Sequence, residues 1–268
     1  MQKMQLPIGV FDSGMGGLTV LRALRSHLPD ESFIYLGDTA RLPYGTKSQD
    51  TVRHYAMQMA RILVERRIKA LVIACNTATT AALSHVQAML PNIPVVGVIA
   101  PGASAAVQTT KNQRILVLGT ETTVASHAYQ GLIQAALPHA CIQARASSLL
   151  VALAEEGMVH NHIARAALEH YLSQRVDEDT VLLGCTHFPV FKPLLRDLLP
   201  EHVRVVDSAE ATADAVKQAL MDAGIANTTQ PQKKTHYLVT DSAARFGAVG
   251  AIFLGEPLNQ QDIELVDA

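Results

Sequence analysis

Two cysteines, Cys75 and Cys185, occupy similar positions in the sequence. Each follows a short run of aliphatic residues and precedes a small polar residue, Asn76 in the first case and Thr186 in the second. A thiol at the carboxyl end of a strand, beside hydrogen-bond donors and a helix N-terminus, can be held as a nucleophilic or basic thiolate. Either cysteine alone could be a small buried hydrophobe. Their matched settings favour one site with a sulfur on each side of a substrate.

Asp12 ends an early apolar run, and a glycine-rich segment, residues 13–17, follows it. A carboxylate is costly to bury without partners, so Asp12 could cap the next helix, pair with a substrate ammonium or relay a proton. The glycines suit a cradle for a carboxylate or a simple strand-to-helix turn. The segment does not match a dinucleotide fingerprint, because Thr19 stands where the third glycine is needed, and it does not match a Walker loop.

Other polar residues allow both a functional and a structural interpretation. His187 could assist Cys185, or it could be an ordinary residue of a first helical turn. Glu155 is most simply a solvated helix end. Residues 160–162, His-Asn-His, are poorly spaced for a metal site, because positions i and i+2 of a helix point apart. The sequence therefore predicts no metal site.

A long turn-rich loop, residues 37–45, follows an apolar run and ends with Tyr44 and Gly45. Such a loop can present a phenol and backbone amides to a ligand, although many loops only connect elements. Cys141 is not followed by a small polar residue, unlike the other two cysteines. It lies in an apolar run and is expected in the core.

Apolar runs of strand length alternate with amphipathic helix patterns along the whole chain, which predicts an α/β fold with parallel sheets. The clearest helix covers residues 48–67, with Ser48 as its N-cap. Further helices are expected over residues 18–28 and 209–223 and from residue 243. Strands are expected at residues 8–11, 33–36, 70–74, 95–98, 115–118, 181–183, 203–206 and 237–239.

The chain also repeats its pattern. Thr120 follows Asp12 by 108 positions, and Cys185 follows Cys75 by 110. This predicts two pseudo-symmetric α/β domains with the active site in the cleft between them, at the carboxyl ends of the strands. The punctuation by Pro and Gly at residues 101–102 marks one boundary. We expect a first domain of residues 1–98 plus 208–268 and a second of residues 99–207.

Composition excludes several classes of protein. With 49% hydrophobic and 17% charged residues, the 268-residue chain is expected to fold as a globular protein. A net charge of −2, 4% aromatic residues and no Trp argue against a nucleic-acid partner. No secretory leader or membrane-length apolar run is evident. Three cysteines without a CxxC pair indicate reduced thiols and a cytoplasmic protein.

Assembled, these segments resemble the glutamate racemases over nearly the whole chain. The matching motifs are FDSGMGG around Asp12, GDTARLPYG ending at Gly45, ACNTAT around Cys75, LGTETT at Thr120, GCTHFP around Cys185, and VDSA at Asp207. Aspartate racemases share two thiols but are not expected to carry this set of motifs. The resemblance therefore favours glutamate as the substrate.

The resemblance implies a role for each matching residue. Cys75 and Cys185 look like the acid/base thiols, with Asp12 assisting the first and His187 the second. Glu155 resembles a residue that helps His187, although the stretch before it lacks the Cys and Pro expected there. Residues at substrate-contacting positions are Asp12, Ser13, Tyr44, Gly45, Asn76, Thr77, Thr120, Thr186 and His187.

The implied activity is cofactor-independent interconversion of L- and D-glutamate by two bases, supplying D-glutamate for peptidoglycan. The sequence carries no signal for a lysine-bound cofactor, and the expected assembly is a homodimer without a membrane partner. Three alternatives stay open. The thiols could form a redox pair, the protein could bind an amino acid without catalysis, or the substrate could be aspartate.

Overall fold

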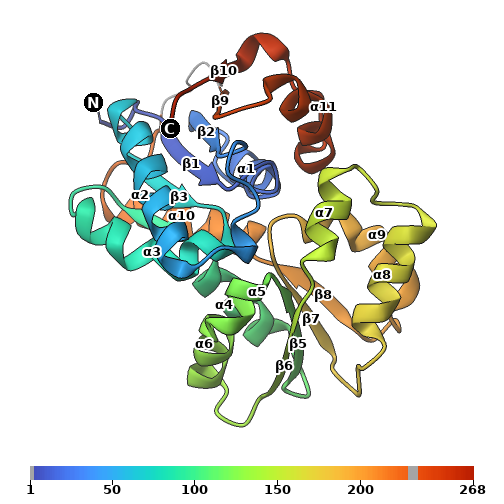
Figure 1. Ribbon diagram of the computed structural model, residues 1–268. Coiled ribbons are helices and arrows are strands. Elements are labelled where there is room, and N and C mark those ends of the chain that lie inside the picture. The colour runs from blue at the N-terminus through green and yellow to red at the C-terminus, as the bar shows by residue number, and fades with distance from the viewer. Residues whose placement is uncertain (1–2, 229–234) are drawn as a thin grey trace.

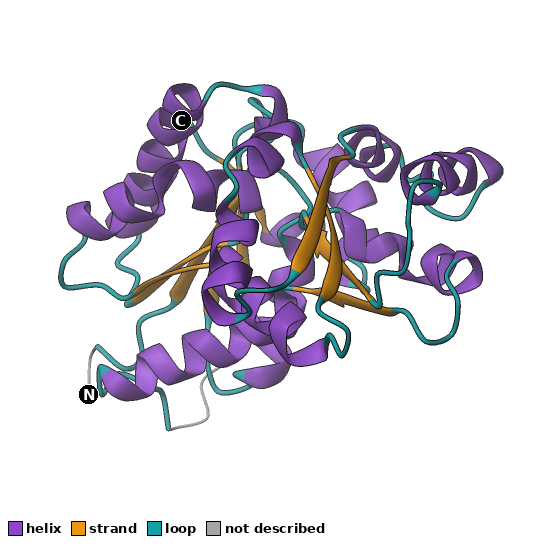
Figure 2. Ribbon diagram, turned by 90° about the horizontal axis from the view of Figure 1, so that it is seen from below, coloured by secondary structure: helices purple, strands orange, loops and turns teal. Residues whose placement is uncertain are grey.

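The computed structural model describes residues 3–228 and 235–268 and contains two parallel sheets with helices between their strands (Figures 1 and 2). The larger sheet has the order β10-β9-β2-β1-β3-β4, and the smaller one β6-β5-β7-β8. Every strand pairing is parallel within the described residues. The strands are β1 (Ile8–Asp12), β2 (Phe33–Gly37), β3 (Ala70–Ile73), β4 (Val95–Gly97), β5 (Arg114–Gly119), β6 (Cys141–Ala146), β7 (Thr180–Gly184), β8 (Arg204–Asp207), β9 (Thr235–Val239) and β10 (Ile263–Leu265).

Helices follow most of the strands, as the alternating sequence pattern predicts. The α-helices are α1 (Leu18–His27), α2 (Gln49–Glu65), α3 (Asn76–Met89), α4 (Ile99–Thr109), α5 (Glu121–Ala125), α6 (Ala128–Ala136), α7 (Leu149–Glu155), α8 (His162–Leu172), α9 (Lys192–Leu198), α10 (Ala209–Asp222) and α11 (Ala243–Leu254). Short 3₁₀ turns are η1 (Tyr44–Thr46), η2 (Phe188–Phe191) and η3 (Gln260–Asp262). No helix among the described residues is long and apolar enough to cross a membrane.

Each sheet is buried on both faces, which explains the continuous apolarity of its central strands. Helices α2 and α3 cover one face of the larger sheet, and α1, α10 and α11 cover the other (Figure 1). In the smaller sheet, alternate residues of β5 enter different cores: Ile115 packs with α4 and α6, and Leu116 with α7, α8 and α9. We call the larger sheet with its helices the first lobe and the smaller sheet with its helices the second lobe.

The two lobes repeat one topology. The order β2-β1-β3-β4 in the first lobe recurs as β6-β5-β7-β8 in the second. The helix that follows the last strand of each set packs on the other lobe. Helix α4 follows β4 and packs against α6 and β8, whereas α10 follows β8 and packs against α1. This crossing supports domain boundaries after residues 98 and 207, which we retain as a proposal. Pro101 and Gly102 do not interrupt the pattern; they lie at the start of α4, where proline is tolerated.

The eight predicted strands and the predicted helices are confirmed. Ser48 caps α2 by accepting a hydrogen bond from the amide of Thr51 at 3.3 Å. Strands β6 and β10 are present although they were not expected. The prediction that Cys141 lies in the core is wrong, because it begins β6, which is the edge strand of the smaller sheet, and its side chain is exposed.

Candidate active site

Cys75 and Cys185 line the same cavity from opposite lobes. Cys75 follows β3 and caps α3, and Cys185 follows β7, the equivalent strand of the second lobe. Both thiols are buried, at 5% and 7% exposure. The cavity has a volume of about 20 Å³, and its other lining residues are Ser13, Pro43, Tyr44, Gly45, Asn76, Thr77, Thr120, Val151, Thr186 and His187.

Cys75 lies at the N-terminus of α3 in a dry setting. Its Sγ accepts a hydrogen bond from the amide of Ala78 at 3.4 Å and donates to Ser13 Oγ at 3.7 Å. Burial, reinforced by the nearby charge of Asp12, raises the pKa of Cys75 to about 12. Cys75 is therefore a protonated thiol at neutral pH in this arrangement.

Cys185 lies beside a histidine that is held from behind by a carboxylate. His187 Nδ1 is 3.8 Å from the Cys185 sulfur, and His187 Nε2 is 2.6 Å from Glu155 Oε1. Burial alone would lower the pKa of His187, but its contacts with Cys185 and Glu155 raise it well above the ordinary value. The imidazole thus provides positive charge and a proton next to the second sulfur.

The interpretation of Glu155 as a solvated helix end is wrong. The residue ends α7 but is only 5% exposed. Its side chain points away from solvent because the last turn of α7 packs at the contact between the lobes, where Glu155 Oε1 lies beside Gly14. The structure therefore brings Glu155 to His187, as the resemblance implies.

Asp12 is fully buried at the end of β1. It accepts hydrogen bonds from the amide of Gly14 at 2.9 Å and from Thr186 Oγ1 of the second lobe at 3.2 Å. The interpretation of Asp12 as the N-cap of α1 is wrong, because the capping position is Gly17 and no side chain caps that helix. Burial raises the pKa of Asp12, although the charge of His187 opposes this effect.

The glycines of residues 13–17 allow the two lobes to approach closely. A Cβ atom on Gly16 would lie 2.4 Å from His187 Nδ1, a distance that no side chain tolerates. The loop is thus a strand-to-helix turn whose surface is shaped by the second lobe. Its residue Ser13 reaches the cavity.

The remaining predicted substrate residues also converge from both lobes. Thr77 of the first lobe lies 2.9 Å from Thr120 of the second, oxygen to oxygen. Asn76 Nδ2 donates to the hydroxyl of Tyr129 at 2.7 Å, and its Oδ1 is buried without a partner. Gly45 accepts a hydrogen bond from Thr122 Oγ1 at 3.0 Å. All of the residues predicted to contact substrate except Asp12 line the cavity.

Asp38 is a residue that the sequence analysis did not single out. It is fully buried directly after β2 and accepts hydrogen bonds from the phenol of Tyr44, from Arg41 and from Thr240. These contacts hold the loop that carries Tyr44 to the cavity. The available signal was its position, since Asp38 follows β2 as Asp12 ends β1.

Residues 160–162 have a structural role. Asn161 caps α8 and accepts hydrogen bonds from the amides of Ile163 and Ala164 at 3.1 and 3.0 Å. Within the described part of the chain, no group of three or more His, Cys, Asp or Glu side chains is arranged to hold a metal ion.

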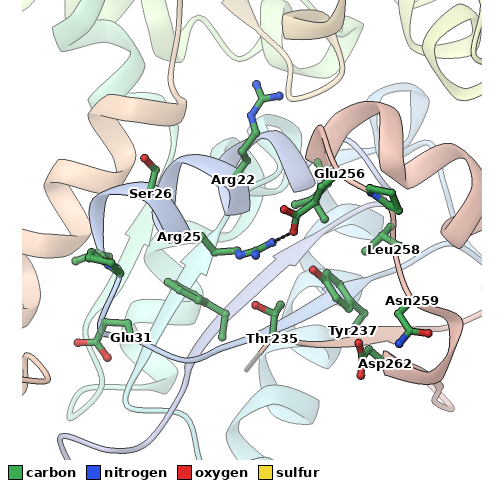
Figure 3. A pocket seen from close by; sticks show the side chains of 15 residues that line it. Arg22, Arg25, Ser26, Glu31, Thr235, Tyr237, Glu256, Leu258, Asn259 and Asp262 are labelled. Atoms are coloured by element: carbon green, nitrogen blue, oxygen red, sulfur yellow. Dashed lines mark hydrogen bonds and ion pairs between the residues drawn. The ribbon is translucent and has the colours of Figure 1, made fainter. Parts of the chain in front are cut away.

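A larger hollow of about 460 Å³ lies between α1, β9 and the segment after α11 (Figure 3). Two of its charged side chains, Arg25 and Glu256, form an ion pair at 2.5 Å. It contains no thiol and none of the predicted site residues. The smaller cavity between the lobes is therefore the better candidate for chemistry.

The fold and its relatives place the protein among the racemases, a class of isomerases. The chain belongs to the Asp/Glu/Hydantoin racemase family, whose model matches residues 18–216. It is 47% identical over 253 residues to a glutamate racemase of Geobacter metallireducens, covering 94% of this chain and 93% of the relative. A glutamate racemase of Neisseria meningitidis is 43% identical over 265 residues, covering 98% and 97%.

Solved structures show the same fold. The crystal structure of a glutamate racemase from Francisella tularensis in complex with D-glutamate superimposes with a TM-score of 0.90 at 35% identity. The match covers 98% of both chains. The two-lobed arrangement is thus shared over the full length.

Proposed function

We propose that this protein interconverts L- and D-glutamate without a cofactor, using Cys75 and Cys185 on opposite faces of the α-carbon. The observation that carries the proposal is that these two buried thiols line one cavity from equivalent strand ends of two similar lobes. The 47% identity to a glutamate racemase of Geobacter metallireducens supports glutamate as the substrate.

The reaction needs one proton removed and one returned. A thiolate takes the α-proton and leaves the electron pair on the carbon, and the opposite thiol gives its proton to the other face. The enantiomer forms with no oxidant or reductant, and the two sulfurs have exchanged protonation states. Thiols suit this exchange because their ordinary pKa, near about 8.5, allows both states to be reached.

The surroundings of the two sulfurs match these duties. The raised pKa of Cys75 keeps it as a proton donor, while the raised pKa of His187 places a positive charge 3.8 Å from the opposite sulfur. Asp12 lies close enough to influence Cys75, and its own raised pKa suits a proton carrier. In the opposite direction of turnover, Asp12 would accept the proton that Cys75 must lose.

The carbanion must be stabilised by fixed hydrogen-bond donors around the substrate carboxylate. Donors at the cavity come from Ser13, Asn76, Thr77 and Thr186. Each preorganised donor is worth about 3 kcal/mol of barrier lowering, so several together are needed. Their burial strengthens each interaction, because little water is present to screen it.

The direct test is loss of optical rotation of L-glutamate by purified protein, with a chelator present and no pyridoxal phosphate, and with aspartate assayed in parallel. We expect racemisation of glutamate and, in D₂O, deuterium at the α-position of the product. Faster turnover of aspartate would assign the other substrate. Calorimetric binding of glutamate without deuterium incorporation would indicate a non-catalytic binder. Activity that appears only after a thiol count shows that a disulfide has formed would indicate redox chemistry.

As part of the same proposal, the D-glutamate enters peptidoglycan synthesis in the cytoplasm, and the protein assembles as a homodimer. Growth of a D-glutamate auxotroph carrying this gene tests the first expectation. Sedimentation of the purified protein tests the second, and a monomer at working concentration would contradict it.

A further inference from the structure

The residue after each catalytic cysteine is hydrogen-bonded to a helix of the opposite lobe. Asn76, after Cys75, donates from Nδ2 to the hydroxyl of Tyr129 on α6 at 2.7 Å. Thr186, after Cys185, accepts through its backbone oxygen from Thr19 Oγ1 on α1 at 3.0 Å, a donor that it shares with the backbone oxygen of Gly16 at 2.9 Å. Each thiol-bearing turn is thus tied across the boundary between the lobes.

The two ties are related by the internal repeat. Thr19 and Tyr129 are both the second residue of their helices, and they stand 110 positions apart, as do Asn76 and Thr186. The two hydrogen bonds therefore occupy equivalent places in the two lobes. Their chemistry differs, because one uses a side-chain amide and the other a backbone carbonyl.

Both tying residues are buried but lie outside the cavity lining. Thr19 is 3% exposed and Tyr129 is 1% exposed. Neither is among the residues that face the cavity. The ring of Tyr129 also packs on Gly184, where an added Cβ would lie 2.9 Å from a ring carbon. Removing only its hydroxyl would therefore keep this packing and break the bond to Asn76.

We propose that Thr19 and Tyr129 are positioning residues, each of which holds the thiol-bearing turn of the opposite lobe in register with the substrate. Tyr129 positions Cys75 through Asn76, and Thr19 positions Cys185 through Thr186. The proposal rests on the two-base function above. In this proposal, proton transfer at Cys75 depends on Tyr129 and proton transfer at Cys185 depends on Thr19. A substitution at one positioning residue therefore slows one of the two transfers and leaves the other unchanged.

The free energies of two enantiomers are equal in water, so kcat/KM must fall equally in both directions for any variant. The isotope effect on removal of the α-proton does not share this constraint. It is large when proton abstraction by the first thiol limits turnover and small when the second transfer limits it. Loosening one thiol turn should therefore raise the effect with one enantiomer and lower it with the other.

The experiment measures the α-deuterium isotope effect on kcat/KM for L- and D-glutamate in wild type, Tyr129→Phe and Thr19→Val. For each variant we expect kcat/KM to fall about tenfold, the effect of losing one buried hydrogen bond. We expect the isotope effects to shift in opposite directions for the two enantiomers, with the pattern of Thr19→Val the reverse of that of Tyr129→Phe.

Matched controls remove hydroxyls that make no contact between the lobes. Tyr171→Phe removes a hydroxyl without a hydrogen-bond partner among the described residues, and Thr109→Val removes one that bonds only within α4, to Ala105. Both should behave as wild type. Thr19→Ser keeps the donor and should restore the wild-type isotope effects, which a loss of packing alone would not explain.

Isotope effects unchanged in both variants, or shifted alike, would overturn the inference. If Tyr129→Phe does not fold, the comparison of Thr19→Val with Thr19→Ser still decides the matter. Absence of racemisation by wild type would instead overturn the proposed function, so the two failures are distinguishable.

Discussion

The two sulfurs differ in what surrounds them. Burial and the nearby carboxyl of Asp12 raise the pKa of Cys75 and favour its thiol form, whereas Cys185 faces an imidazole held by Glu155. A pair that must hold one proton between its members gains from such asymmetry, since the resting state is defined. The arrangement requires the Asp12 carboxyl to be buried, which lowers the stability of the folded protein when that carboxyl is charged.

We expect Asp12→Asn to stabilise the folded protein at pH 8 while lowering kcat about 100-fold, as loss of a proton relay would. Burial raises the folded pKa of Asp12, so the folded state binds the proton more tightly than the unfolded chain. The resulting stability is fully present below the unfolded pKa of about 3.9 and is lost as pH rises through the folded pKa.

Thermal unfolding from pH 4 to pH 8 checks this prediction. At pH 8 the free energy of unfolding of the variant should exceed that of wild type by about 1 kcal/mol, because the variant buries no charge. This difference should shrink towards pH 4. The exposed Asp197→Asn variant is the control and should show no such trend. A variant less stable than wild type at pH 8 would contradict the sign of the shift.

Cys141 should be the first thiol to react with iodoacetamide at pH 8. It is exposed, whereas Cys75 is buried with a pKa raised to about 12. Mass spectrometry of the singly modified protein should place the label on Cys141, and racemisation should survive it. The Cys141→Ser variant should resist this labelling and keep full activity. Inactivation in step with the first label would contradict the assignment.

The site residues that could be predicted from the sequence are those that directly follow a strand. Cys75 and Cys185 could be predicted because an apolar strand and a polar turn flank each of them. Glu155 was misjudged because its burial depends on the contact of α7 with the opposite lobe. Thr19 was missed for a similar reason, since its partner Thr186 lies 167 positions away and no local pattern marks the contact.

At the scale of elements, a buried ion pair joins three segments at the edge opposite the cavity. Lys69, just before β3, lies 2.5 Å from Glu31, which follows α1. The Lys69 ammonium also donates to the backbone oxygen of Ile225, just after α10, at 3.0 Å. Both charged side chains are nearly inaccessible to water. The pair thus fixes how α1 and α10 sit on the larger sheet.

Lys69→Met should destabilise the protein by about 3 kcal/mol, because it leaves the carboxylate of Glu31 buried without its cation. The double variant Lys69→Met with Glu31→Leu should recover part of this loss, since both charges are then gone. Urea denaturation measures both values. A double variant less stable than the single variant would contradict this explanation, because the loss could not then come from an unpaired charge on Glu31.

Element prediction succeeded for the strongly apolar strands, including the edge strands β4 and β8, and failed at the other two sheet edges. The eight central or strongly apolar strands could be identified from their aliphatic runs. Strand β6 could not, because Gln143 and Arg145 break its apolar pattern at the sheet edge. Strand β10 has only three residues and is largely exposed, so packing against β9 defines it rather than its own sequence.

At the scale of the whole molecule, the cavity between the lobes is too small for a substrate. Its volume of about 20 Å³ holds about one water molecule, far less than an amino acid. Contacts that span the lobes surround it, among them the hydrogen bonds from Thr122 to the backbone oxygens of Gly45 and Lys47. Substrate entry and product release therefore require the lobes to separate.

Saturating glutamate should slow amide hydrogen exchange in residues 43–47 and 119–125, because bound ligand favours the closed arrangement. Exchange in the interior of β1, which both neighbours already protect, should not change. Mass spectrometry of peptides with and without glutamate measures this. Equal exchange at both segments in the two conditions would contradict coupling between ligand and closure.

The central claim is that two opposed thiols act on one carbon. The most direct measurement is the racemisation rate of L-glutamate by Cys75→Ala and by Cys185→Ala, each compared with wild type and with Cys141→Ser. The account predicts a fall of at least about 100-fold in both active-site variants and none in the control. Full racemisation by either active-site variant would contradict it.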